Sequence, residues 1–397
     1  MIPMINEIIS RIKTVLSFSD NSIALHEPCF NGNEWKYAKE CLDTGWVSSV
    51  GKFVDRFEVG LASFTGAKYA VATVNGTAAL HLCYLLAGVK SGDEVLIPAL
   101  TFVATANALS YCGAIPHFIE SEEKSLGINV FLLDQYLKEI TEQKNNLCVN
   151  RITGRPIRAL CVMHTLGHPA DLDPLVELCK KYRLILVEDA AEALGSYYKG
   201  AHVGHMGLVG ALSFNGNKII TTGGGGAILT NEIQIAKLAK HMTTTAKLPH
   251  PWLFEHDQVG YNYRLPNINA ALGCAQVEQL SKFLNAKRML AEKYQEIFSG
   301  LVGLRFVKEP DYAKSNYWLN ALLLDSSFES ARDSLLETLN KNNIMSRPFW
   351  NLLHTLPMYK DAPRMPLFVA ESLHKRLVKI PSSALLGMRY LTSEATS

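Results

Sequence analysis

The chain has 397 residues, 48% of them hydrophobic, and its 39 basic side chains are nearly balanced by 37 acidic ones. This length predicts two domains, and the near-neutral charge argues against a nucleic-acid-binding or polybasic membrane-binding protein. The eight cysteines form no CxxC pair and no Cys/His cluster with zinc spacing, which predicts reduced thiols in a cytoplasmic protein without a metal site.

The first 18 residues, "MIPMINEIISRIKTVLSF", carry apolar side chains at helical spacing, interrupted by Glu7, Arg11 and Lys13. No run in the chain approaches the roughly 18 apolar residues of a membrane span. We therefore expect residues 1–24 to be a helical extension that packs on its own chain or on a partner subunit, and we expect no membrane association.

Short apolar runs alternate with helical patterns from about residue 66 to residue 230. "KYAVATV", "DEVLIP", "AIPHFIE", "RALCVMH" and "RLILVED" are typical of strands, and the stretches between them have helical spacing. This alternation predicts an α/β fold, in which a mostly parallel sheet carries helices on both faces. We assign residues 25–265 to this large domain.

A long helical pattern with few breakers follows at residues 266–298. Beyond it, strands are expected near residues 303–307 and 316–324 and a helix near 329–341. Residues 266–397 are therefore predicted to form a linking helix and a smaller α+β domain.

"VATVNGTAALHL" changes from a strand pattern to a helix pattern at Gly76 and Thr77. Free N–H groups at a helix N-terminus bind anions, and a glycine lets the anion approach closely, so this turn is a candidate phosphate site. The alternative is an ordinary helix cap formed by Asn75 or Thr77.

Three other residues come at or just after predicted strands. Asp189 ends a buried strand, at the sheet edge where ligands bind in open α/β folds, although it could simply cap the next helix. Phe102 follows another strand and could stack on a ligand or belong to the core. His164 also ends a strand, and we expect it to face the cofactor or substrate, with a buried core histidine as the alternative.

Lys218 lies within "GALSFNGNKIITTGGGGAIL". A lysine beside glycines can bind phosphate, form a Schiff base, or lie on the surface. A P-loop needs its glycines before the lysine and a hydroxyl after it, whereas here the glycines follow and Ile219 comes next. No G-x-G-x-x-G stands between a strand and a helix, which disfavours a nicotinamide dehydrogenase.

Together these features fit one ligand, pyridoxal 5'-phosphate (PLP). Its phosphate needs a helix N-terminus, its ring an aromatic surface, its pyridine nitrogen a carboxylate, and its aldehyde a lysine.

The chain also resembles the DegT/StrS family of PLP-dependent sugar aminotransferases, through "NGTAAL", "TFVAT", "VEDAAEALGS", "SFNGNK…GGGG" and "GYNYRLPNINAA" in this order. The resemblance covers nearly the whole chain and implies the type I (aspartate aminotransferase) fold. It implies that Lys218 forms the Schiff base and that Asp189 pairs with the pyridine nitrogen. It places Phe102 against the ring and Gly76 and Thr77 at the phosphate.

The same resemblance extends to other positions. Ser213 matches a hydroxyl that binds the phosphate. Asn262 matches a residue that reaches the phosphate from the neighbouring subunit, which implies a homodimer with shared active sites. Glu192 stands near the ring hydroxyl, where many members carry Gln. The family's usual G-E-G-G is all glycine here, a departure that bears on substrate fit.

The stretches "GNEW", "CLDTGWVSSVGK" and "HTLGHPADLD" most resemble the LegC-like branch of the family. This implies transfer of an amino group from L-glutamate to C4 of a UDP-linked 4-keto-6-deoxy-N-acetylhexosamine. GDP-perosamine synthases and C3-specific dTDP- or UDP-sugar aminotransferases are the enzymatic alternatives. The non-enzymatic alternative is a catalytically silent regulator or assembly partner with this fold. Arg347 could pair with a diphosphate or a glutamate carboxylate, or be an ordinary surface arginine.

Overall fold

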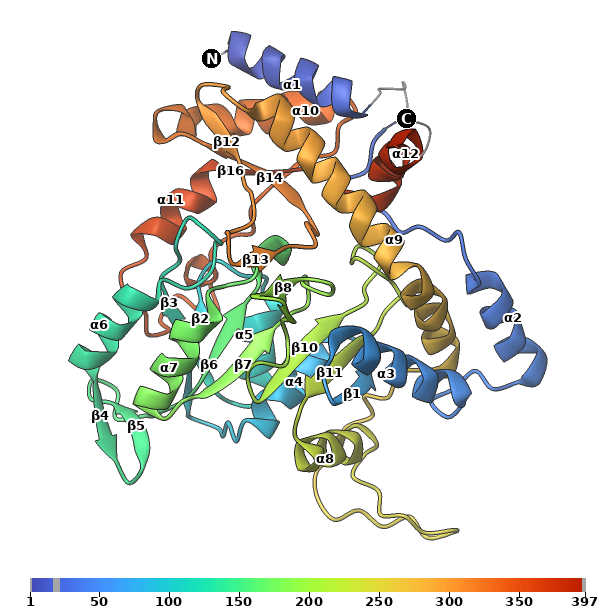
Figure 1. Cartoon of the computed structure of the whole chain (residues 1–397). Helices are drawn as coiled ribbons and strands as arrows, with labels where there is room; N and C mark the ends of the chain where they lie inside the picture. Colours follow the sequence, from blue (N-terminus) through green and yellow to red (C-terminus); the bar gives the residue numbers. More distant parts are fainter. Residues whose placement is uncertain (1, 17–21, 395–397) are drawn as a thin grey trace.

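A nine-stranded sheet forms the centre of the large domain in the computed structural model, which describes residues 2–16 and 22–394 (Figure 1). Seven strands follow one another across it: β1 (Tyr69–Thr73), β11 (Gly226–Thr230), β10 (Val209–Ser213), β7 (Ile185–Asp189), β6 (Pro156–Met163), β2 (Glu94–Pro98) and β3 (Ile115–Ile119). The hairpin of β4 (Thr141–Lys144) and β5 (Leu147–Asn150) adds to β6.

Strands β10, β7, β6, β2 and β3 run parallel, and β11 is antiparallel to both of its neighbours. The central strands are buried along their length, as expected for a sheet covered on both sides. The prediction of a mostly parallel α/β sheet is confirmed.

The order of the strands places the helices and the ligand site. From β2 the chain crosses to β3 through α5 (Ala104–Tyr111), and from β6 it crosses the opposite way to β7 through α7 (Leu172–Tyr182). Right-handed crossovers in opposite directions put their helices on opposite faces of the sheet. The direction changes between β6 and β2, and a ligand crevice forms beyond the carboxyl ends of the strands at such a point.

The remaining elements of the large domain surround this sheet. They are α2 (Glu34–Thr44), α3 (Lys52–Thr65), α4 (Gly76–Leu86), α6 (Val130–Ile140), η1 (Thr165–Gly167), β8 (Tyr197–Tyr198), β9 (Ala201–His202) and α8 (Ile233–Thr243).

The small domain begins along the long helix α9 (Asn267–Phe298), which runs beside both domains (Figure 1). Its antiparallel sheet has the order β12 (Leu304–Phe306), β14 (Asn320–Leu324), β16 (Leu377–Ile380) and β15 (Arg347–Pro348). The other elements are β13 (Ala313–Lys314), η2 (Ser326–Ala331), α10 (Arg332–Lys341), η3 (Leu353–Thr355), α11 (Phe368–Arg376) and α12 (Ala384–Glu394).

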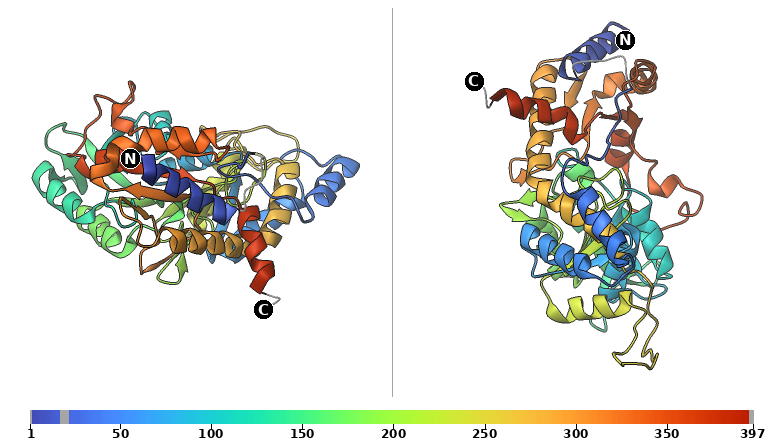
Figure 2. Two further views of the ribbon diagram at one scale, coloured as in Figure 1. Left: turned by 90° about the horizontal axis from the view of Figure 1, so that it is seen from above. Right: turned by 90° about the vertical axis from the view of Figure 1, so that its right-hand side faces the viewer.

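The N-terminal helix α1 (Ile2–Leu16) packs on the small domain of its own chain (Figure 2). Its buried side chains, among them Ile5, Ile8 and Ile12, join Tyr294 of α9 and Leu335 of α10 in one apolar cluster. The spacing of these isoleucines places them on a single helix face, which explains why this face is covered.

None of the helices in the described ranges is both long enough and apolar enough to cross a bilayer. All eight cysteines are free thiols.

Candidate active site

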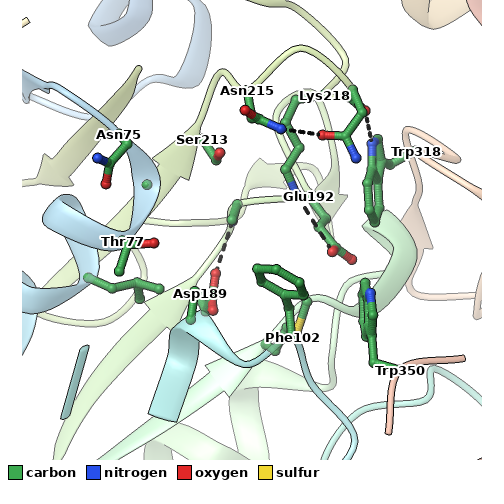
Figure 3. A pocket seen from close by; sticks show the side chains of 16 residues that line it. Asn75, Thr77, Phe102, Asp189, Glu192, Ser213, Asn215, Lys218, Trp318 and Trp350 are labelled. Carbon is green, nitrogen blue, oxygen red and sulfur yellow. Dashed lines mark hydrogen bonds and ion pairs between the residues drawn. The ribbon is translucent and has the colours of Figure 1, made fainter. Parts of the chain in front are cut away.

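A cavity of about 320 Å³ lies at the carboxyl edge of the large sheet. The turn after β1, the end of β6 and the loops that follow β2, β7 and β10 contribute to its wall, and so do two tryptophans of the small domain (Figure 3). Seven of the residues predicted from the sequence line this cavity: Gly76, Thr77, Phe102, Asp189, Glu192, Ser213 and Lys218.

One end of the pocket is a cradle at the N-terminus of α4. Asn75 caps this helix, because its side chain accepts a hydrogen bond of 2.8 Å from the Ala78 N–H. The earlier N–H groups of the first turn have no partner within the helix, so those of Gly76 and Thr77 are available to an anion. Ser213 lies on the other side of this cradle (Figure 3).

Glycine is required here because two backbone segments meet. A Cβ on Gly76 would lie 2.8 Å from Cβ of Ser213, closer than side chains pack. A Cβ on Gly226 would lie 2.6 Å from the carbonyl of Asn75. At Gly224, by contrast, a Cβ would have nothing within 4 Å. The glycine run thus has a packing role at Gly226, whereas Gly224 faces open space.

Asp189 ends the central strand β7 and points into the pocket. Oδ2 accepts a hydrogen bond of 2.7 Å from Thr105 Oγ1, and Oδ1 accepts one of 3.2 Å from the Ala191 N–H. Burial raises the pKa of Asp189, and these two hydrogen bonds act against that shift. A cationic ligand group beside this carboxylate would favour its ionised form.

Lys218 lies in the loop between β10 and β11. Its Nζ is 3.7 Å from Oε1 of Glu192 and 4.1 Å from the centroid of the Trp318 ring. Trp318 also fixes this loop, because its Nε1 donates a hydrogen bond of 2.6 Å to the Asn217 carbonyl (Figure 3). The lysine is therefore held between an acid and an aromatic face.

Glu192 is almost completely buried, and its Oε2 accepts a hydrogen bond of 2.9 Å from the Leu166 N–H. Burial raises its pKa to about 7, and the nearby Lys218 acts in the opposite direction. This carboxyl can therefore change protonation state near neutral pH.

The small domain closes the side of the pocket opposite the cradle with Trp318 and Trp350 (Figure 3). Trp350 packs edge-on against Phe102, with ring centroids 5.8 Å apart, and Phe102 keeps 48% of its surface exposed. Sequence reasoning did not include the two tryptophans or Thr105. No local motif marks Trp318, because the contact depends on how the two domains pack.

His164 does not face the pocket, and the prediction that it contacts cofactor or substrate is wrong. Side chains alternate along a strand, and the preceding Met163 takes the pocket side of β6. His164 is fully buried, its Nε2 lies 3.1 Å from Oε2 of Glu188, and its Nδ1 accepts a hydrogen bond from the Ala170 N–H. It is a buried core histidine with both nitrogens occupied.

Asn262 also lies outside the pocket of its own chain. It is exposed, and its Oδ1 accepts hydrogen bonds of 3.3 and 3.1 Å from the Arg264 guanidinium. Its predicted contact is with a neighbouring subunit and stays a prediction.

The arrangement fits PLP. The cradle at Gly76 suits a phosphate, Asp189 suits a protonated ring nitrogen, and Lys218 supplies a lysine in the wall of the same pocket.

Comparison with known proteins agrees with this arrangement. The model of the DegT/DnrJ/EryC1/StrS aminotransferase family matches residues 28–391. The chain belongs to this family. It is a PLP-dependent aminotransferase with the type I fold predicted from the sequence.

Two relatives of this DegT-family chain are GDP-perosamine synthases. The enzyme from Vibrio cholerae is 39% identical over 361 residues, covering 91% of this chain and 94% of the relative. That from Escherichia coli O157:H7 is 37% identical, covering 91% and 93%. Among solved structures, Helicobacter pylori PseC, an aminotransferase of pseudaminic acid biosynthesis, superimposes with a TM-score of 0.83 at 25% identity, covering 95% and 98%. These relatives do not confirm the LegC-like branch.

Proposed function

We propose that the enzyme transfers an amino group from L-glutamate to C4 of a GDP-linked 4-keto-6-deoxy hexose. The observation that carries this proposal is the similarity to GDP-perosamine synthases, which extends over nine-tenths of both chains. The GDP-linked sugar thereby replaces the UDP-linked N-acetylhexosamine as the first candidate substrate. That sugar remains a second candidate because "GNEW" and "CLDTGWVSSVGK" resemble the LegC-like branch.

The residues divide the chemistry as follows. Gly76, Thr77 and Ser213 would hold the cofactor's phosphate, and Asp189 would keep its ring nitrogen protonated. When bound, PLP supplies the electron sink that the reaction needs. Lys218 Nζ accepts the proton from the donor's α-carbon and later delivers a proton to C4 of the sugar. A positioned general base of this kind increases the reaction rate on the order of 10²- to 10⁴-fold.

We also propose that the working form is a homodimer in which Asn262 completes the partner's phosphate site. Large apolar side chains are exposed on α2, on the segment between α2 and α3, and on the loop after α8, such as Trp35 at 83% and Trp252 at 75%. A second copy would cover such patches. A cytoplasmic location stays a prediction.

The test is incubation with L-glutamate and GDP-, UDP- or dTDP-linked 4-keto-6-deoxy sugars, followed by mass spectrometry and NMR of the products. We expect a 4-amino sugar from the GDP-linked substrate at the highest kcat/KM. A higher kcat/KM with the UDP-linked sugar, or an amino group at C3, would overturn the assignment. Heat-treated enzyme and Lys218→Ala serve as controls.

A further inference from the structure

A second buried lysine lies next to the active-site pocket. Lys379 belongs to β16 of the small domain and exposes only 4% of its surface. Its Nζ lies 4.5 Å from the centroid of the Trp350 ring and 5.3 Å from that of Phe349. Trp350 is part of the pocket wall. The ammonium is therefore separated from the pocket by little more than this tryptophan.

Among the described residues, no acidic side chain forms a hydrogen bond or ion pair with Lys379. Within residues 2–16 and 22–394, its ammonium makes neither a hydrogen bond nor an ion pair, and its close contacts are the two aromatic rings. Aromatic faces compensate only part of the lost hydration of a buried cation. Charged side chains are rarely buried in proteins without a paired group. An unpaired buried ammonium is therefore a candidate binding site for an anionic ligand.

A second cation makes this position still less favourable. Arg347 of β15 is directly opposite Lys379 in the antiparallel pair, so both side chains project from the same face of the small sheet. Like charges placed opposite each other destabilise a sheet. Burial lowers the pKa of Lys379 to about 8; Lys218 and Arg347 add to this shift, and Glu192 opposes it. The ammonium form still predominates at neutral pH, so an anion bound here would be strongly attracted.

Lys379 interacts electrostatically with Glu192, which lies at the reacting end of the pocket. Its charge lowers the pKa of the Glu192 carboxyl, which lies 3.7 Å from Lys218 Nζ. An amino donor must bring its nitrogen to the Lys218 end, and its α-carboxylate is then only one carbon away. Lys379 is buried, and a single carboxylate is much smaller than a nucleotide diphosphate. The position of Lys379 therefore suits a donor carboxylate better than the diphosphate of the nucleotide sugar.

We propose that Lys379 recognises the amino donor by pairing with one of its carboxylates at the Trp350 side of the pocket. The exposed Arg347, paired with Lys379 across the strands, adds a second positive charge on this face of the small sheet. The assignment deepens the proposed function and rests on it, because it presumes an amino-acid donor.

The test separates the two half-reactions in the PLP-loaded enzyme. The change in near-visible absorbance on addition of L-glutamate reports the donor half-reaction, and the reverse change on addition of the keto sugar reports the other. We expect Lys379→Met to raise the L-glutamate concentration for half-maximal rate about 10-fold or more, which is the size expected for a lost charge-assisted hydrogen bond. The sugar half-reaction should change less than about 3-fold, and Lys379→Arg should keep most of the donor affinity.

The matched control is Lys341→Met, which removes an exposed lysine of α10 in the same domain. A second measurement does not depend on turnover: titration of the cofactor-loaded enzyme with glutarate, followed by tryptophan fluorescence from Trp318 and Trp350. Glutarate should bind about 10-fold more weakly to Lys379→Met than to the wild type.

Thermal denaturation distinguishes a binding role from a structural one. Since Lys379 is unpaired, Lys379→Met should unfold at the same or a higher temperature than the wild type. Unchanged donor kinetics and glutarate affinity in a folded Lys379→Met would overturn the proposal. So would a defect confined to the sugar half-reaction, which would assign the subsite to the diphosphate. If the wild type itself fails to react with L-glutamate, the proposed function fails instead.

Discussion

The Nζ atom of Lys218 lies 3.7 Å from Oε1 of Glu192, and both side chains are shielded from solvent. The family resemblance places Glu192 where many members carry glutamine, which has no charge. In this enzyme the reactive lysine therefore has an acidic neighbour whose pKa of about 7 lets it be neutral or ionised under physiological conditions. This pair gives the site a pH dependence that a glutamine would not provide.

Replacing Lys218 with alanine should abolish transamination while leaving the fold intact. In the proposed mechanism the amine is both the attachment point for the cofactor and the base at the donor's α-carbon, so we expect a loss of at least about 10³ in kcat. Borohydride reduction followed by peptide mass spectrometry should fix the cofactor at residue 218 in the wild type and at no site in the variant. A reducible adduct elsewhere in Lys218→Ala, with normal turnover, would contradict this.

Glu192→Gln should stabilise the cofactor-free protein at pH 8 but hardly at pH 5. The folded pKa of Glu192 is raised from 4.5 to about 7, mainly by burial. Between these two values the unfolded chain has already released the proton that the folded chain retains, so the wild type loses stability as pH rises through this window. The loss amounts to about 3 kcal/mol above pH 7, and the neutral amide avoids it.

Urea denaturation at pH 5 and pH 8 measures this difference. The exposed Glu337 on α10 provides the control, since Glu337→Gln should change stability by no more than about 0.5 kcal/mol at either pH. A stabilisation by Glu192→Gln that is equal at both pH values would show that the carboxyl does not titrate in this window.

Gly76→Ala should weaken cofactor binding. The new Cβ would lie 2.8 Å from Cβ of Ser213, so the cradle must widen or α4 must shift. Overpacking of this kind costs about 1–3 kcal/mol, equivalent to a roughly 10- to 100-fold higher Kd for PLP if it falls on the cradle. Gly224→Ala is the matched control, because its Cβ meets nothing within 4 Å. Equal PLP affinities of the two variants, measured by titration of the cofactor-free protein, would refute the role assigned to Gly76.

How far the sequence predicted this site depends on whether each contact is local. The strand-to-helix turn at Gly76 and the strand end at Asp189 carry local signals, and both lie in the pocket. His164 also ends a strand, but strand alternation gives the pocket side to Met163. The pattern of the sequence alone does not say which of two neighbouring residues faces the ligand.

The small-domain contributions were harder to predict. Trp318 and Lys379 come from segments far from Lys218 in sequence. Trp318, just before β14, lines the pocket, whereas Lys379 of β16 lies against the pocket residue Trp350, and β14 and β16 pair in one sheet. Periodicity predicted β14 approximately but did not predict β16 (Leu377–Ile380), and it contains no information on how the two domains pack. Such residues are visible only once the tertiary structure is known.

The proposed sharing of the active site between subunits predicts complementation between two impaired variants. Lys218→Ala and Asn262→Ala should each be impaired as homodimers, the second through weaker PLP binding. If Asn262 acts across the interface, a mixed dimer places both lesions in one site and leaves the other intact. Equal amounts of the two chains, dissociated and reassembled at random, should then recover about a quarter of the wild-type activity, because half of the dimers are mixed and each has one working site. If Asn262 instead served its own chain, every site in the mixed dimer would carry a lesion and no activity would return.

Two controls accompany this experiment. Sedimentation of the mixture should confirm that dimers have reassembled, and mixing Lys218→Ala with itself gives the background against which recovery is measured.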